Sequence, residues 1–300
     1  MKKHLLLFGL GLALTSLVVD INATIQLYFL LVALLLTGVP HGSLDYFVEA
    51  QTLKGLNQEI SIRSFLTKYL LNMIVYGIFW FLFPTAALIV FIGLTAFHFG
   101  EIDWPVRKKS TLDAVLYTVY GLQMIVFIIT SHIQEAAPIL EIIVRNTIPF
   151  STWIEVSKTV FILCSASLLV NALLLLVVYK QLGWDKTMLG AFFAQSLFLF
   201  VLVYQLPLYL SFGFYFGFWH SGLSFNLIRK QLNLTDTWNG WMHLIKKAIP
   251  YTMVAWLGLA ALILITFHTN TQLFLITNLF VGIALLSLPH LQVFTKIKAQ

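Results

Sequence analysis

Long apolar runs, separated by short polar connections, dominate this 300-residue chain. Ten runs stand out, at 5–19, 25–39, 66–83, 85–99, 114–131, 158–179, 187–204, 208–228, 249–267 and 272–289. A helix needs about 20 apolar residues to cross a bilayer, and these runs are too unbroken for the alternating pattern of a membrane β-barrel. The pattern predicts an all-α, polytopic transmembrane helical bundle of about ten helices, with eight or nine as alternative counts. Pro84 alone divides the third run from the fourth, which indicates a tight turn or a kink.

Composition strengthens this prediction and excludes a soluble protein. Apolar residues make up 59% of the chain and charged residues 10%, against roughly 45–50% and about 25% in soluble domains. We find no soluble domain or repeat, so we expect one membrane domain over 1–300. The only cysteine, Cys164, lies inside an apolar run, which excludes an intrachain disulfide.

The net charge of +6 gives no indication of nucleic-acid binding, because the Lys and Arg residues lie in short loops between the apolar runs. If the N-terminus is inside and the ten runs alternate, 16 of the 18 Lys and Arg residues fall on the inner face, and only Arg145 and Lys158 fall outside. The positive-inside rule predicts such a bias. We therefore expect an N-in, C-in protein of the cell inner membrane. The first run lacks a cleavage site after Val19, so we expect it to stay attached rather than act as a signal peptide.

Four histidines lie in or at the ends of apolar runs, where ionisable groups are costly and usually functional. They are His41, His98, His220 and His290. All four belong to even-numbered runs, so the predicted topology brings them to a similar depth near the inner face. Imidazoles gathered at one depth in a helical bundle suit a transition metal such as iron, zinc or copper. A single histidine at a helix end is more commonly a cap or an interfacial polar residue. We interpret the other four histidines in this way, namely His4, His132, His243 and His268.

Carboxylates follow two of these histidines at helical spacing. Asp45 lies four residues after His41, and Glu101 lies three residues after His98. If the helices continue, each carboxylate shares a face with its histidine and is either a direct ligand or an acceptor that orients the imidazole. A solvated charge next to the membrane is the alternative. We expect Asp103 to lie in the following loop.

An aromatic run, FGFYFGFW at 212–219, leads into His220. Its small residues at four-residue spacing favour close helix packing. Its aromatic residues, including Phe216 and Trp219, are candidates for lining a slot for a flat, elongated apolar substrate. Phe216, His220 and Ser224 share one helical face.

Four short blocks, in order along the chain, carry a family resemblance. They are GVPHGSLDY at 38–46, FHFGEID at 97–103, YFGFWHS at 215–221 and LPHLQV at 288–293. In these blocks the chain resembles the Brp/Blh-type β-carotene 15,15′-dioxygenases, prokaryotic integral membrane enzymes that form retinal. The resemblance covers most of the chain, from about residue 38 to residue 293.

The resemblance implies a non-haem Fe(II) cofactor held by histidines, with His41, His98 and His220 at the ligand and catalytic positions. One position departs from the family pattern, which continues W-H-S-x-x-H, because Ser224 occupies the place of the second histidine. A serine hydroxyl is a poor iron ligand. We therefore expect His290, Asp45 or Glu101 to complete the metal shell, or the metal site to be weakened or lost.

The implied activity is cleavage of β-carotene by O₂ into two retinals, with passage of retinal to a rhodopsin-type partner. Two alternatives stay open. One is another histidine-ligated membrane metalloenzyme, such as a carotenoid or lipid desaturase or hydroxylase, although HxxH-type clusters are absent from the sequence. The other is a carrier or transporter with no enzymatic activity.

Overall fold

The computed structural model describes residues 1–105, 110–266 and 272–296, and their regular structure is helical, with no strand among them. This confirms the all-α prediction. Five residues of the charge and histidine patterns lie outside the described residues, namely Arg107, Lys108, Lys109, His268 and Lys298.

The first half of the chain contains helices α1 to α8, with one π-helical segment, η1. Their bounds are α1 Lys2–Val18, α2 Ala23–Ala33, η1 Leu34–Gly38, α3 Val39–Gly42, α4 Asp45–Lys54, α5 Ile62–Leu82, α6 Pro84–Asp103, α7 Thr111–Ser131 and α8 Ile133–Ile143. Pro84 is the first residue of α6, and the backbone turns at Phe83. The alternatives of turn and kink at Pro84 are thus resolved as a tight turn between two helices.

The second half contains α9 to α14 and a second π-helical segment, η2. Their bounds are α9 Phe150–Val178, α10 Lys186–Gln205, α11 Leu208–Phe212, η2 Gly213–His220, α12 Ser221–Gln231, α13 Trp238–Thr266 and α14 Gln272–Phe294. Each of the ten predicted apolar runs is helical over its described residues except at Val19, Phe83 and Tyr179, which directly follow the last residues of α1, α5 and α9.

Seven helical stretches among the described residues are long and apolar enough to cross a membrane, which indicates a multi-pass membrane protein. They are Ala23–Lys54, Ile62–Leu82, Pro84–Asp103, Thr111–Ser131, Phe150–Val178, Lys186–Gln205 and Leu273–Phe294. The predicted runs that correspond to α1, α11–α12 and α13 are not among them. The count of ten spans and the N-in, C-in orientation therefore stay predictions.

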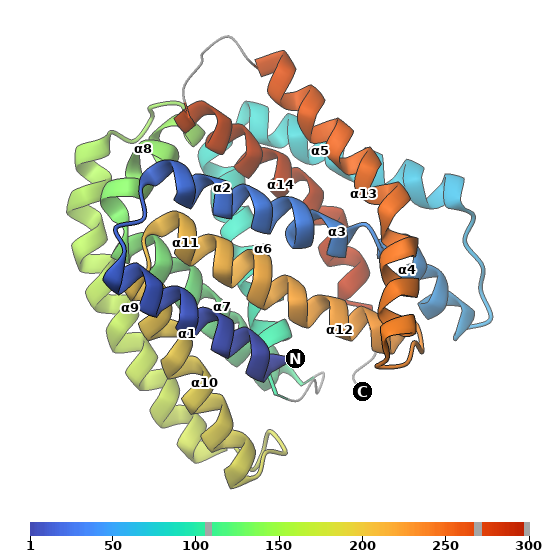
Figure 1. The fold of residues 1–300 in the computed structure, drawn as a ribbon, viewed down its shortest axis with the longest axis horizontal. Helices are drawn as coiled ribbons and strands as arrows, with labels where there is room; N and C mark the ends of the chain where they lie inside the picture. The colour runs from blue at the N-terminus through green and yellow to red at the C-terminus, as the bar shows by residue number, and fades with distance from the viewer. Residues whose placement is uncertain (106–109, 267–271, 297–300) are drawn as a thin grey trace.

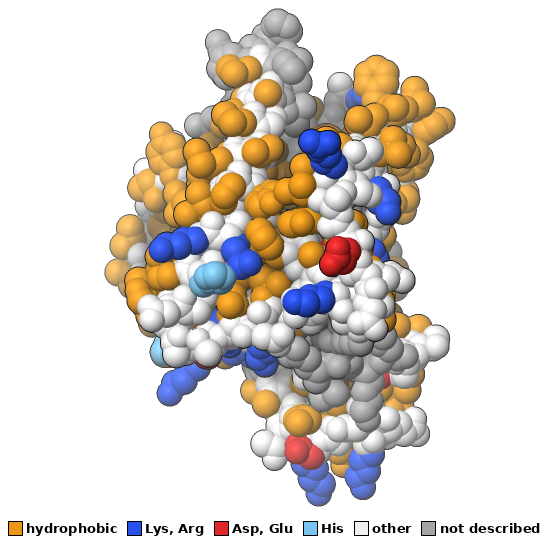
Figure 2. Space-filling view, turned by 90° about the vertical axis from the view of Figure 1, so that its right-hand side faces the viewer, with side chains coloured by type: hydrophobic (Ala, Val, Ile, Leu, Met, Phe, Trp, Pro, Cys, Tyr) orange, Lys and Arg blue, Asp and Glu red, His pale blue; other side chains and the backbone are white. Residues whose placement is uncertain are grey.

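The surface supports a lipid environment. Large apolar side chains on α9 are exposed, as shown by Leu163 at 62% and Val177 at 75%. On the face in Figure 2, apolar side chains predominate in the upper part, and Lys and Arg side chains lie mainly across the middle and at the lower edge. Exposed apolar area of this extent is stable in hydrocarbon and would aggregate in water.

Helix α6 lies inside the bundle and packs against α5, α7, α14 and η2 (Figure 1). Helix α2 and segment η1 run along α11 and η2, and α14 packs against α3 and α6. Segments that are far apart in the sequence are therefore neighbours, including those that carry the four candidate histidines.

The two π-helical segments adjoin two of these histidines. Segment η1 directly precedes Val39-Pro40-His41, and His220 is the last residue of η2. Pro40 has no N–H and cannot donate to the preceding turn, so a widened turn upstream accommodates it without ending the helix. Widened π turns of this kind occur frequently at functional sites.

Segment η2 approaches α2 closely because Gly217 has no side chain. A Cβ atom at Gly217 would lie 2.6 Å from Cβ of Ala33. The small-residue packing predicted for this run is therefore observed at Gly217, and it holds the backbone before His220 against α2.

We expect Gly100→Leu to prevent stable folding, because α6 and α7 touch at this position. A Cβ at Gly100 would lie 1.6 Å from the carbonyl oxygen of Tyr117. Gly93→Leu in the same helix is the matched control, since a Cβ there meets no atom within 4 Å. The measurement is the fraction of monodisperse protein recovered in detergent. Equal recovery of both variants would contradict the packing described for α6 and α7.

Candidate metal centre

The four histidines predicted from the sequence come together in one buried cluster. His41 lies in α3, His98 in α6, His220 at the end of η2 and His290 in α14. None is more than 6% exposed. Four buried imidazoles from four segments are a costly arrangement unless their nitrogens are engaged.

Each of the four imidazole rings lies close to two of the others. The ring centroid of His98 lies 4.8 Å from that of His220 and 5.1 Å from that of His290. The centroid of His41 lies 4.8 Å from that of His290 and 5.6 Å from that of His220. One nitrogen from each of His41, His98 and His290 lies within 4.8 Å of the other two, a spacing that allows one ion to contact all three.

Two of the rings are held through Nδ1. Nδ1 of His41 lies 3.3 Å from the carbonyl oxygen of Thr37, and Nδ1 of His290 lies 2.8 Å from a carboxylate oxygen of Asp45. Donation of the Nδ1 hydrogen to these acceptors leaves Nε2 with a lone pair, which is the usual arrangement of a metal-binding histidine.

Asp45 is hydrogen-bonded to His290 and not to His41, the histidine that the sequence spacing paired with it. Its second carboxylate oxygen accepts a hydrogen bond of 3.1 Å from the hydroxyl of Tyr69 in α5. Asp45 is 1% exposed. The carboxylate therefore links α4, α5 and α14 beside the histidine cluster.

Asp103 differs from the sequence prediction, which placed it in a loop. It is the last residue of α6, fully buried, and accepts hydrogen bonds of 2.9 Å from both the hydroxyl of Tyr215 and the indole N–H of Trp219. These two residues lie one helical turn apart in η2, so Asp103 fixes η2 to α6 directly before His220. No sequence motif indicates this role.

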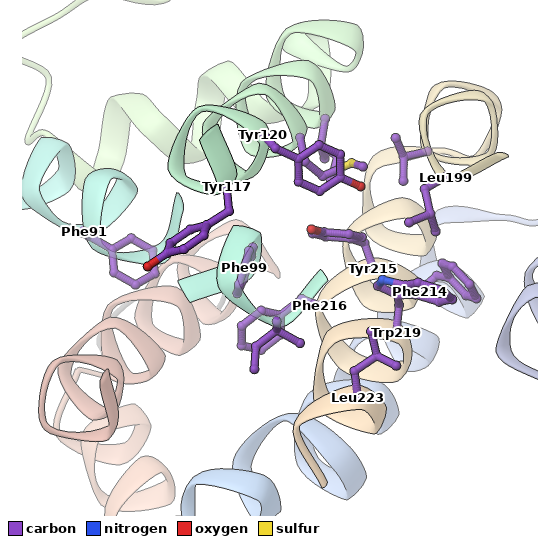
Figure 3. Close-up of a cluster of buried hydrophobic side chains, with 14 of the residues drawn as sticks. Phe91, Phe99, Tyr117, Tyr120, Leu199, Phe214, Tyr215, Phe216, Trp219 and Leu223 are labelled. Atoms are coloured by element: carbon purple, nitrogen blue, oxygen red, sulfur yellow. The ribbon is translucent and has the colours of Figure 1, made fainter. Parts of the chain in front are cut away.

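Phe216 and Trp219 lie in different surroundings, although both belong to the aromatic run. The ring of Phe216 lies 5.6 Å from that of Phe99, and both face the histidine-lined cavity. Figure 3 shows Phe216 directed towards Phe99, with Trp219 farther along η2. Trp219 lines neither of the two cavities described below, and its indole N–H donates to Asp103. Its substrate-lining role therefore stays a prediction.

Two further predicted residues are not part of the lining of these cavities. Glu101 is half-buried near the end of α6. Ser224 is fully buried in α12, and its Oγ has no hydrogen-bond partner within the described ranges. The cluster is thus made of the four histidines and Asp45, with Tyr69 as a participant that the sequence did not reveal.

Two neighbouring cavities lie beside the cluster. The larger, of about 590 Å³, is lined by all four histidines and by Asp45. The smaller, of about 120 Å³, has almost entirely apolar walls. Four residues line both cavities, namely Thr95, Phe99, Phe216 and Ile283. An elongated apolar molecule that passes between the two cavities would run beside the histidines.

The residues present fit a divalent transition-metal ion. Nε2 of His290 is buried and has no hydrogen-bond partner in the part of the chain that the structure describes. A buried polar atom of this kind is rare unless a ligand or ion engages it. Neutral imidazoles with an adjacent carboxylate are a donor set typical of non-haem iron, zinc and copper sites.

Comparison with known proteins agrees with the resemblance in the four sequence blocks. The family model described as beta-carotene 15,15'-dioxygenase matches residues 32–298, a range that contains the whole cluster. A protein named beta-carotene 15,15'-dioxygenase, from uncultured marine bacterium 66A03, is 24% identical over 258 residues, which cover 85% of this chain and 87% of that relative. No solved structure matches the chain. The chain belongs to the beta-carotene 15,15'-dioxygenase family.

Proposed function

We propose that this protein is an iron-dependent oxygenase that cleaves the central 15,15′ double bond of β-carotene with O₂ and releases two molecules of retinal. The carbon–carbon double bond breaks, and each of the two carbons gains one oxygen atom. Both atoms of O₂ are thereby used, so the reaction requires no further reductant.

One observation carries the proposal. Histidines from four separate segments line one cavity, which shares four wall residues with a second cavity, and the remaining walls of both are mainly hydrocarbon. A metal site that faces an apolar space suits a substrate without polar groups, which must be held by shape. Membership of the family supports the same substrate and reaction.

His41, His98 and His290 are the proposed iron ligands, and His220 is the fourth candidate. Bound ferrous iron supplies the binding and activation of O₂. His290 supplies a ligand in place of the histidine that Ser224 replaces, since its ring centroid lies 4.8 Å from that of His41 and 5.1 Å from that of His98. The carboxylate of Asp45 accepts the Nδ1 hydrogen of His290, and the backbone carbonyl of Thr37 accepts the Nδ1 hydrogen of His41. Nε2 of each ring is then available to the metal.

The walls of the cavities position the substrate and exclude water. Phe99 and Phe216 line both cavities and would hold the centre of the polyene beside the histidines. Fixing a reactive bond in this way lowers the entropic part of the barrier. We place the protein in the cell inner membrane, where β-carotene and O₂ are available and retinal can pass to a rhodopsin-type protein.

Expression in bacteria that accumulate β-carotene tests the proposal. We expect the cells to lose the orange pigment and to form retinal, identified by chromatography, because the cavity delivers the central double bond to the cluster. Cells with the empty vector are the control. Intact β-carotene at good protein levels would contradict the proposal, and a hydroxylated or desaturated carotenoid would identify the alternative metalloenzyme.

A further inference from the structure

The histidine-lined cavity reaches the outer surface of the bundle between α5 and α13. On the α5 side it is lined by Leu66, Leu70 and Met73, which lie on one helical face. On the α13 side it is lined by three residues at four-residue spacing, namely Pro250, Val254 and Gly258. Two helical stripes therefore form the sides of one opening.

Residues of both stripes are exposed at the surface as well as lining the cavity. Leu70 is 54% exposed, Val254 is 69% exposed, and Leu66 is 39% exposed. Helix α14, which carries His290, packs against both α5 and α13 (Figure 1). Its residues, including Ile283 and Ser287, line the cavity. The cavity is thus continuous from the surface of the apolar helices to the buried histidines.

Three hydroxyl groups in the cavity wall already donate hydrogen bonds to the backbone. The hydroxyls of Ser287 and Ser43 in the cavity wall each bond to a carbonyl oxygen of their own helical region, at 2.8 Å to Ile283 and 3.3 Å to Val39. The hydroxyl of Thr95 bonds in the same way to Phe91 at 2.8 Å. These three hydroxyls are satisfied by the backbone, and most of the surface that lines the cavity is hydrocarbon.

We propose that the gap between α5 and α13 is a lateral gate through which a long, apolar polyene enters the site directly from the lipid. The inference rests on the proposed function and adds the route by which substrate arrives. An apolar stripe on a membrane-facing helix is in contact with acyl chains, and a molecule dissolved among them reaches the gate without crossing water.

The gate can be narrowed without disturbing the core. Val254 is exposed, so Val254→Trp adds volume at the gate and not in a packed interior. Gly258→Leu does the same, since a Cβ there meets no atom within 4 Å. Leu257 is 70% exposed on α13 and does not line the cavity, so Leu257→Trp is the control for Val254→Trp. Gly93→Leu in α6 is the control for Gly258→Leu.

The first measurement is retinal formation in liposomes over a range of mole fractions of β-carotene in the lipid. We expect kcat/KM to fall on the order of tenfold in Val254→Trp and Gly258→Leu, because hindered entry slows association. The controls should retain the wild-type value, and the metal content of all four variants should be unchanged. Equal kcat/KM in gate and control variants would overturn the gate.

A second measurement does not depend on turnover. In a Cys164→Ala background, Val254→Cys or Leu257→Cys carries a nitroxide label in liposomes, and its mobility is recorded with and without β-carotene. We expect β-carotene to immobilise the label at 254 and to leave the label at 257 unchanged. If retinal forms while the label at 254 does not respond, the gate is overturned and the proposed function stands. If the label responds while no retinal forms, the proposed function fails and the gate stands.

Discussion

His98→Ala is expected to lower retinal formation by at least about 100-fold, beyond the 10–100-fold range that removal of an outer-shell partner produces. The ring of His98 lies 4.8 Å from His220 and 5.1 Å from His290, and its helix α6 is packed on several sides. Alanine removes one proposed ligand without a group that can replace it. The rate of retinal formation by purified protein in liposomes, at matched protein amounts, measures the effect.

His243→Ala is the matched control for His98→Ala. His243 is an exposed histidine of α13 that does not line either cavity. We expect this variant to keep the activity and the metal content of the wild type. A His98→Ala protein that folds and retains more than about a tenth of the wild-type rate would show that His98 is not a ligand.

Asp45→Asn is expected to lower the rate about 10- to 100-fold, the range found when an acceptor behind a metal-bound histidine is changed. The carboxylate of Asp45 accepts from Nδ1 of His290 at 2.8 Å and from the hydroxyl of Tyr69 at 3.1 Å. Asparagine keeps the shape of the side chain but removes the charge that orients and polarises the imidazole. The variant should therefore also lose iron to a chelator faster than the wild type.

Glu49→Gln is the control for Asp45→Asn, because Glu49 is a buried carboxylate one turn later in the same helix. Its ion pair is with Lys296, at 2.7 Å, and it does not line the cavities. We expect iron release at the wild-type rate. If Asp45→Asn and Glu49→Gln release iron equally fast, the orienting role of Asp45 is wrong.

The helical elements of the fold could be predicted from the sequence because the bilayer imposes a strong constraint. Every backbone polar group in hydrocarbon must be bonded internally, so long apolar runs form helices. Apart from single residues at the ends of three runs, each of the ten runs is helical where it is described, and α5 and α6 are divided directly before Pro84. The number of membrane crossings was less predictable, since several runs are near the minimum length for a span.

The four clustered histidines could also be predicted, because an ionisable side chain within an apolar run is rare and usually functional. Their distances could not, since these depend on how α3, α6, η2 and α14 pack. The pairing of Asp45 with His290 illustrates the limit. Spacing along one helix favoured His41 as its partner, whereas the actual partner lies 245 residues away in sequence.

The bond between Asp103 and Trp219 could not be predicted, for a physical reason. Taken within their own segments, Asp103 suggests a loop charge and Trp219 suggests part of an aromatic lining. The structure shows that they bond to each other across α6 and η2 at 2.9 Å. A π-helical segment rotates the side chains after it relative to an α-helix, so the faces of η2 could not be assigned from a spacing of 3.6 residues.

The iron content of the purified protein tests the central claim most directly. Wild type, His41→Ala, His98→Ala, His290→Ala and His243→Ala would be purified in the same detergent, loaded with Fe(II) without oxygen, and analysed by mass spectrometry. We predict about one iron per chain in wild type and in His243→Ala, and little in the three cluster variants. Equal iron in all five proteins, or none in a folded wild type, would contradict a histidine-held iron centre.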